Sequence, residues 1–435
     1  MDRPAAPGLP PGLRHALTHR VTAAELAPVA ALLGSADPAL TSRAAATLMT
    51  RLLVSRFPGP GTRLLREDFR YAGQLAEGDL LELAVEVAGP APMGGLALRC
   101  TVRHAGGAAV LDGLAEVTPP PAAPLGAETP FGVQPRRMLN LLLERCRGLP
   151  PLPAAIAHPC DASSLEGAVL AARHGLVAPI LVGPEARIRG TAQAAGLDIS
   201  GFELVPAPHS HASAGMAVAL VGQGRAAALV KGSLHTDELL AAALAREAGL
   251  RTERRVSHSF VMDAPLYPRL LIITDAAINI APDLEAKADI VRNAIRVAVA
   301  IGVELPRVAL LSAVETVTPR LASTLDAAAL CKMADRGQIM GGILDGPLAF
   351  DNAVSEAAAR AKGIVSAVAG RADILVVPDI ESGNMLAKQL AHLGGAEGAG
   401  VALGLRVPLA LTSRSDDATS RLASAALLRL TAGAG

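Results

Sequence analysis

A short polar segment around residue 413 combines residue types that acyl-transfer and phosphate chemistry require. Thr412-Ser413-Arg414-Ser415-Asp416-Asp417 directly precedes a predicted helix over about 418–431. Helix N-terminal amides favour anions, and a guanidinium adds a bidentate clamp for phosphate or carboxylate. Ser413 could donate to a developing oxyanion, and Asp416 could accept a proton from a thiol or hydroxyl. The alternative interpretation is a capping segment, because Ser and Asp are common N-caps.

Polar residues also follow several other strand-like runs in the second half of the chain. They include the segments 274–279, 312–316 and 345–347. Ligands of open α/β sheets bind outside the carboxyl ends of the strands, so we expect these segments to outline one site. The predicted substrate-binding residues are Lys231, Gly232, Ser233, His235, Asp345, Asn352, Asp379, Glu381 and Asn384. For residues 230–238 the alternative is an ordinary βα turn, because the segment lacks Walker A spacing.

The polar residues do not predict a metal site or a cysteine nucleophile. Asp379, Glu381 and the carboxylates of 345–352 form neither a DxD pair nor an HxxxH helix, so hydrogen-bonding roles are favoured over a metal. The four cysteines are far apart in the sequence, without CxxC or Cys/His spacing, and are interpreted as small buried hydrophobic residues.

The elements that must position these residues fall into two regions. Six prolines between 118 and 136 predict a linker, since such a stretch continues neither a sheet nor a helix. Before it, residues 22–54 are typical of helix. Residues 79–117 alternate as strands, with Leu81, Leu83, Val85 and Val87 on one face. This predicts an α+β domain over 1–118.

After the linker, apolar runs alternate with amphipathic helices. Runs such as 178–184, 227–230, 270–273, 308–311 and 374–377 are typical of strands buried on both faces of a mainly parallel sheet. In the helix predicted around 286–301, Val291, Ile295 and Val299 share one face and Gly302 ends the helix. We therefore expect residues 137–435 to form a doubly wound α/β region of two lobes with a cleft between them.

Composition excludes several function classes. Forty basic residues balance forty acidic ones and only 2% are aromatic, which argues against a nucleic-acid partner. No apolar stretch approaches the ~20 residues of a membrane span, so no membrane contact is expected and the predicted location is cytoplasmic.

The region from about 150 to 430 resembles the phosphate acetyltransferase/phosphate butyryltransferase family, more closely its butyryltransferase branch. The matching segments include HPCDASSLEGAV (158–169), VKGSLHT (230–236), TDAAINIAPDLEAK (274–287), CKMADRGQIMGGILDGPLAFDNAVS (331–355) and LTSRSD (411–416). The resemblance implies a fold shared with isocitrate and isopropylmalate dehydrogenases, usually dimeric. It also implies reversible transfer of a short acyl group between CoA and phosphate, with CoA as a substrate and no cofactor.

The resemblance assigns catalytic roles to Ser413, Arg414 and Asp416. In the family an Arg next to a Ser stabilises the transition state, and a nearby Asp takes the CoA thiol proton. The acetyltransferases carry their Asp at the position of Ser420, and this leaves the identity of the base open. An arginine that they use for CoA is replaced within Ala391-His392-Leu393. A non-catalytic acyl-CoA or acyl-phosphate binding protein is therefore the alternative; a decarboxylating dehydrogenase would instead need nicotinamide and a metal.

Residues 57–87 resemble the MaoC-like enoyl-CoA hydratases, which have a hot-dog fold. Their catalytic Asp and His would fall on Ser35 and Leu40, and neither residue is a general acid or base. The resemblance implies a fusion of the bifunctional enoyl-CoA hydratase/phosphate acetyltransferase type whose hydratase activity is lost.

Overall fold

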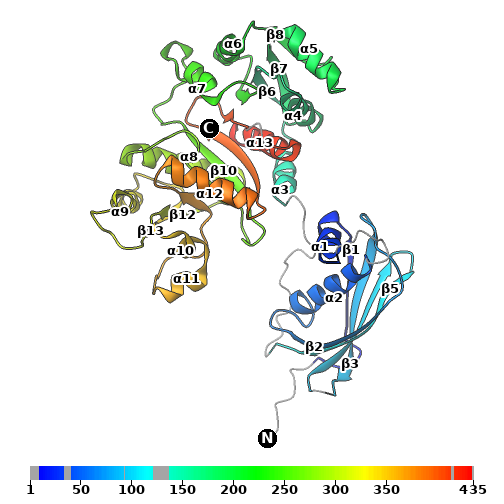
Figure 1. Cartoon of the computed structure of the whole chain (residues 1–435). Coiled ribbons are helices and arrows are strands. Elements are labelled where there is room, and N and C mark those ends of the chain that lie inside the picture. The colour runs from blue at the N-terminus through cyan, green and yellow to red at the C-terminus, as the bar shows by residue number, and fades with distance from the viewer. Residues whose placement is uncertain (1–8, 34–40, 93, 121–136, 413–415, 434–435) are drawn as a thin grey trace. The chain divides into compact units, whose positions relative to one another are not determined.

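The computed structural model describes residues 9–33, 41–92, 94–120, 137–412 and 416–433, and the chain divides into two compact units, Met1–Pro135 and Arg136–Gly435 (Figure 1). Most of the predicted linker, residues 121–136, lies outside the described residues. Each unit has its own sheet and its own hydrophobic core.

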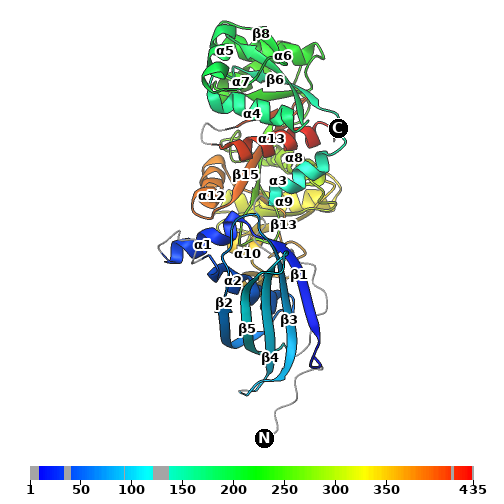
Figure 2. The same ribbon diagram turned by 90° about the vertical axis from the view of Figure 1, so that its right-hand side faces the viewer.

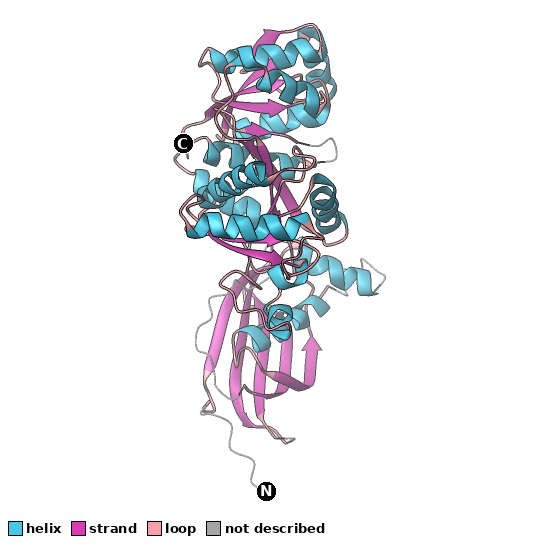
Figure 3. Cartoon of the chain, turned by 90° about the vertical axis from the view of Figure 1, so that its left-hand side faces the viewer, coloured by secondary structure: helices cyan, strands magenta, loops and turns pink. Residues whose placement is uncertain are grey.

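The first unit is an antiparallel sheet with a helix against one face (Figure 3). Its elements are β1 (Arg14–Arg20), α1 (Ala23–Leu33), α2 (Arg43–Ser55), β2 (Arg63–Tyr71), β3 (Leu80–Pro90), β4 (Leu96–His104) and β5 (Ala109–Thr118). The strand order is β1-β3-β4-β5-β2. The predicted face of Leu81, Leu83, Val85 and Val87 is buried, and it packs in one core with Leu48, Leu52 and the other apolar residues of α2. The sequence did not predict β1 and β2. Most residues of these two strands are exposed or half-buried, so they form no apolar run.

The second unit contains one long mixed sheet in the order β13-β12-β14-β11-β10-β15-β16-β9-β6-β7-β8. The strands are β6 (Leu152–Ala157), β7 (Val177–Gly183), β8 (Glu203–Pro206), β9 (Ala228–Lys231), β10 (Ser257–Asp263), β11 (Leu271–Thr274), β12 (Arg307–Leu311), β13 (Ile343–Leu348), β14 (Ile374–Val376), β15 (Glu397–Leu403) and β16 (Leu409–Ala410). The five strand runs predicted at 178–184, 227–230, 270–273, 308–311 and 374–377 are strands, and each end agrees within one residue.

Helices cover both faces of this second sheet (Figure 3). They are α3 (Arg137–Cys146), α4 (Ala162–Arg173), α5 (Glu185–Ala194), α6 (Ser210–Gly222), α7 (Thr236–Leu244), η2 (Arg246–Ala248), α8 (Leu284–Ala300), α9 (Ala322–Asp335), α10 (Phe350–Val354), α11 (Glu356–Ala361), α12 (Ile380–His392) and α13 (Ala418–Thr431). Figure 2 shows α13 lying between α4 and α8, and α13 contacts both of these helices. In α8, Val291 and Ile295 are buried as predicted, but Val299 is exposed. Gly302 ends this helix with a positive φ of 95°.

The expectation of a mainly parallel sheet needs a correction at its centre. β10 pairs antiparallel with both β11 and β15, and β15 pairs antiparallel with β16. Three antiparallel steps therefore separate β11 from β16. The strands β11 to β14 run in one direction, and β16, β9, β6, β7 and β8 run in the other. The carboxyl ends of the strands in the two halves therefore point in opposite directions.

No helix in the described part of the chain is long and apolar enough to cross a membrane.

Candidate active site

The segment after β16 is anchored on each side of residues 413–415 by polar contacts, of which the Thr412 contact is buried. Thr412 is buried and its hydroxyl donates to the backbone oxygen of Lys231 (3.3 Å). Asp417 caps α13, because its carboxylate accepts from the amide of Ser420 (2.7 Å). Asp416 is half-buried beside this cap. Of the predicted catalytic residues, Ser413 and Arg414 lie outside the described residues, and their roles stay predictions.

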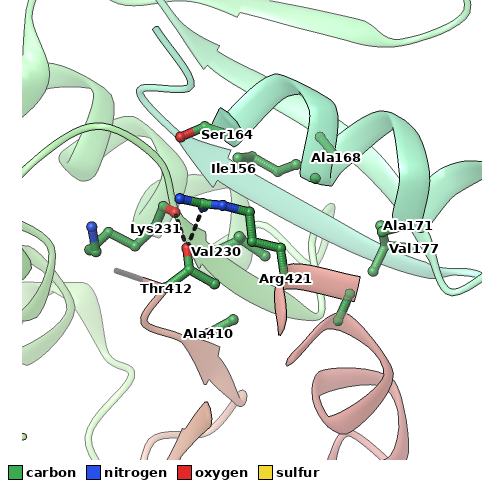
Figure 4. Close-up of a pocket in the computed structure, with 12 residues that line it drawn as sticks. Ile156, Ser164, Ala168, Ala171, Val177, Val230, Lys231, Ala410, Thr412 and Arg421 are labelled. Atoms are coloured by element: carbon green, nitrogen blue, oxygen red, sulfur yellow. Dashed lines mark hydrogen bonds between the residues drawn. The ribbon is translucent and has the colours of Figure 1, made fainter. Parts of the chain in front are cut away.

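An arginine that the sequence did not single out joins the two sides of this segment. Arg421 donates through Nη1 to the Thr412 hydroxyl (2.9 Å) and through Nε to the backbone oxygen of Asp416 (3.2 Å). Its Nη2 reaches the Ser163 hydroxyl in α4 (3.2 Å). Figure 4 shows the guanidinium pointing from α13 across Thr412. The sequence did contain a signal for Arg421. A positive charge in the first turn of a helix is disfavoured by the helix dipole, so its presence indicates that specific contacts stabilise it.

The Lys231 turn lies directly beside Thr412. Lys231 is 7% exposed and its ammonium donates to the backbone oxygens of Gly232 (3.2 Å) and Leu234 (3.3 Å). Ser233 donates to the backbone oxygen of His158 (2.9 Å) and accepts from the amide of Cys160 (3.2 Å). These contacts tie the ends of β9 and β6 together and place the predicted residues 231–233 next to the 412–421 region.

An open pocket of about 450 Å³ lies at the carboxyl ends of β6 and β9. It is lined by His158, Cys160, Asp161, Arg187, Ser210, Ser233, Leu234, His235 and Glu238. The predicted residues Ser233 and His235 thus face a space large enough for part of a substrate. Burial raises the pKa of the Cys160 thiol, which keeps this cysteine protonated and unreactive at neutral pH.

The remaining predicted residues belong to the other half of the sheet. Asp379 caps α12 by accepting from the amide and hydroxyl of Ser382 (both 2.8 Å). Asn384 donates to the backbone oxygen of Ala276 (3.1 Å), in the turn after β11. These contacts hold α12 to the 274–279 turn.

Asp345, Asn352 and Glu381 differ in their surroundings. The Asp345 carboxylate accepts from the amide of Gly346 (2.8 Å), and Glu381 is exposed in the first turn of α12. Asn352 is fully buried, and neither polar atom of its side chain has a hydrogen-bond partner among the described residues. Asp345, Asn352, Asp379, Glu381 and Asn384 lie in or after strands of the half of the sheet that runs opposite to β9 and β16, and their contribution to one common site stays a prediction.

The turn after β11 is organised by a buried carboxylate. Asp275 is 3% exposed and accepts from the amides of Ala277 (2.9 Å), Ile278 (3.1 Å) and Asn279 (3.2 Å). The Asn279 side chain adds a fourth donor at 2.6 Å. Because four donors satisfy the carboxylate, Asp275 stabilises the conformation of this turn.

A neighbouring histidine, His258, is also buried, but its ring nitrogens lack hydrogen-bond partners among the described residues. His258 lies in β10 and is 0% exposed. Burial lowers its pKa to about 4, although the charge of Asp275 acts in the opposite direction. The histidine is therefore neutral in the folded protein at neutral pH.

We expect His258 to make the protein acid-sensitive. The unfolded chain binds a proton near pH 6.5 and the folded chain only near pH 4, so stability falls as pH falls between these values. A difference of this size corresponds to a loss of ~3 kcal/mol. His258→Leu should remove most of this loss, measured as the urea midpoint at pH 7 and pH 4.5. The matched control, His392→Leu at an exposed position, should keep the wild-type pH dependence. If His258→Leu also lost as much stability between pH 7 and pH 4.5 as the wild type, other groups would be the cause of the acid sensitivity.

Comparison with known proteins identifies the family of this chain. Residues 209–428 match the family described as "Phosphate acetyl/butaryl transferase". A phosphate acetyltransferase of Rhizobium meliloti is 60% identical over 289 residues, which cover 66% of this chain and 92% of that protein. The chain belongs to the phosphate acetyl/butyryltransferase family.

Two further relatives support the assignment to the phosphate acetyl/butyryltransferases. A phosphate butyryltransferase of Clostridium acetobutylicum is 43% identical over 64% of this chain and 93% of its own length. The crystal structure of a branched-chain phosphotransacylase from Enterococcus faecalis V583 matches 64% of this chain and 99% of that chain, with a TM-score of 0.56 and 31% identity. The acetyltransferase of R. meliloti is 60% identical and this butyryltransferase 43%, so the predicted closer resemblance to the butyryltransferase branch is wrong for these relatives.

Proposed function

We propose that this chain is a phosphate acyltransferase that transfers a short acyl group reversibly between CoA and inorganic phosphate. The observation that carries the proposal is the 60% identity to the R. meliloti phosphate acetyltransferase over 92% of that protein. At this similarity over nearly the whole relative, the same fold and the same reaction class are expected for residues 137–435.

The region around α13 supplies the groups that the reaction needs. In one direction the CoA thiol loses its proton and its sulfur attacks the acyl-phosphate carbonyl; the C–S bond forms, the C–O bond breaks, and phosphate leaves. We assign proton acceptance to Asp416 and stabilisation of the developing charge to Ser413 and Arg414. The N-terminus of α13 and the Lys231 turn, which is bonded to Thr412, contribute positive potential to this region.

CoA and phosphate are the substrates of this proposal, and no cofactor enters it. Ser233 and His235 line the pocket beside the Lys231 turn, which supports a role for this pocket in holding CoA. We propose that Asp345, Asn352, Asp379, Glu381 and Asn384 also contact the substrates, from the oppositely directed half of the sheet. We further propose a cytoplasmic location and a homodimer or higher homo-oligomer, whose size light scattering would measure.

Thiol release from acyl-CoA is the direct test of the proposal. Purified protein should release CoA from acetyl-, propionyl- or butyryl-CoA only when phosphate is present, and an equal amount of acyl phosphate should form. Replacing phosphate with sulfate at equal ionic strength should abolish release. Binding of CoA without any release would instead support the alternative, a non-catalytic acyl-CoA binding protein.

For the first unit we propose a degenerate hot-dog domain over residues 1–118, joined by a linker over 119–136. Its support is the antiparallel strand order β1-β3-β4-β5-β2, with α2 packed on one face. Ser35 and Leu40 lie outside the described residues, so the argument against hydration rests on their chemistry. Its proposed role is assembly or thioester contact.

We expect no hydration of crotonyl-CoA by the full chain. Neither Ser35 nor Leu40 is able to activate water or protonate the enolate carbon. The loss of the enoyl absorbance of crotonyl-CoA should stay at the rate of a heat-denatured sample. Hydration above that background, at a rate proportional to protein concentration, would overturn this prediction.

A further inference from the structure

Arg421 connects four separate elements through one buried side chain. It is 7% exposed and, through the three bonds described above, touches Thr412 after β16, Asp416 before α13, and Ser163 at the start of α4. The hydroxyl of Thr412 in turn donates to the backbone oxygen of Lys231 in β9, which adds this strand to the network. Every one of these contacts lies in the described residues on the two sides of positions 413–415.

The α4 end of this network is itself firmly anchored. Ser163 accepts from Arg421 and donates to the Asp161 carboxylate (3.0 Å), which also accepts from the amide of Ser164 (2.7 Å). Hydrogen bonds from Ser164 and Ser163, together with the charge of Arg421, lower the pKa of Asp161 despite its partial burial. Asp161 therefore stays ionised and holds Ser163 in place for Arg421.

Local packing makes room for the arginine stem. A Cβ added to Gly167 in α4 would lie 3.1 Å from Cδ and 3.3 Å from Cβ of Arg421, so the stem runs directly over this glycine. The cavity that Arg421 lines with Lys231, Thr412 and Ser164 has a free volume of only about 30 Å³. That space holds one or two water molecules and excludes an acyl phosphate. Arg421 consequently acts through its protein contacts.

We propose that Arg421 is a positioning residue of the acyl-transfer reaction. By fixing Thr412 and Asp416, it sets the distance and direction between the two ends of the segment that carries Ser413 and Arg414. It also orients the backbone that carries the proposed base. This inference rests on the proposed function, and it adds a residue to which neither the sequence patterns nor the comparisons assign a role.

The expected signature is a loss of kcat with little change in substrate binding. Arg421→Met keeps most of the buried stem but removes the donors of the three hydrogen bonds to Thr412, Asp416 and Ser163. We expect kcat to fall roughly 10- to 100-fold, because displacement of reacting groups by about 1 Å is enough for such an effect. The KM for acyl-CoA should change less than about threefold. Arg421→Lys should recover only part of the loss, since an ammonium cannot reproduce the planar fork of donors.

Two further variants separate positioning from general destabilisation. Arg429→Met, in the same helix, removes a donor to the backbone oxygen of Pro150 (2.7 Å) and should leave kcat unchanged. Ser163→Ala removes only the α4 contact and should lower kcat about 3- to 10-fold at an unchanged Kd for CoA, following the smaller displacement. Ser163→Ala also decides the question if Arg421→Met fails to fold.

The outcomes are distinguishable. Wild-type kcat in Arg421→Met, or in both Ser163→Ala and Arg421→Lys, would overturn the positioning role while leaving the proposed reaction intact. A loss of kcat that matches the loss of folded protein, measured by circular dichroism on the same sample, would overturn it as well. Absence of phosphate-dependent thiol release in the wild-type protein would instead refute the proposed function itself.

Discussion

Arg414→Ala is expected to lower kcat/KM for phosphate-dependent acyl transfer by roughly 10²- to 10³-fold, the usual effect of removing one donor to a developing oxyanion. The guanidinium is assigned to the charge that appears on the carbonyl and phosphate oxygens in the transition state. Initial rates of CoA release over a range of acetyl-CoA and phosphate concentrations would measure the effect. Because a positive charge alone recovers only part of a bidentate contact, Arg414→Lys should be intermediate.

The matched control for this prediction is Arg406→Ala. Arg406 is exposed in the turn between β15 and β16, where it donates to the backbone oxygen of Gly249 (3.4 Å). This variant should keep wild-type rates. Full activity in Arg414→Ala would remove Arg414 from the site and leave the start of α13 without an assigned catalytic cation.

Gly232→Ala is expected to damage both stability and activity. A Cβ at this position would lie 2.5 Å from the backbone oxygen of Ala157 and 2.6 Å from that of His158. Both atoms are backbone, so the strand ends must move apart, and overpacking of this kind costs ~2–3 kcal/mol. The same movement would displace Lys231 and the Thr412 hydroxyl that is bonded to it. Urea unfolding followed by circular dichroism would report the stability, and CoA release would report the activity.

Gly215→Ala provides the opposite case in the same unit. Gly215 lies exposed in the middle of α6, and nothing is within 4 Å of an added Cβ. Alanine should stabilise this helix by up to ~1 kcal/mol because it has the higher helix propensity. Equal stability changes in the two variants would show that the close approach at Gly232 is tolerated and that our packing argument is wrong.

Most strands of the second unit were predictable because burial on both faces requires continuous apolar runs. β7, β9, β11, β12, β14 and β16 are such runs. β10 and β15 were not predictable on this basis: Ser257, His258 and Ser259 interrupt β10, and Gly398 and Gly400 interrupt β15. Asn293 from α8 donates to the Ser257 hydroxyl (2.9 Å), so a polar side chain of this strand is bonded by a helix residue that lies 36 residues further along the chain.

The missed strands explain why the site was only partly predictable. The sequence pattern correctly indicated which residues lie at or just after strand ends: Lys231 is the last residue of β9, and Thr412 and Asp379 follow β16 and β14. Whether those ends meet depends on strand direction, and direction reverses at β10 and β15, the pair that the pattern did not reveal. Arg421 was hidden for a different reason: its contacts with Ser163 and Thr412 depend on how α13 packs against α4, which local periodicity does not encode.

The two-residue strand β16 has a consequence for how this protein is made. It sits between β15 and β9, and the Lys231–Thr412 contact joins positions 181 apart in the chain. Until the ribosome has synthesised residues 409–410, β9 has a partner on one side only, and its other edge presents unpaired backbone groups during synthesis. Such non-local closure slows folding and lengthens the time during which nascent chains are able to associate. Refolding yield should therefore fall with protein concentration and rise with a chaperone that shields strand edges.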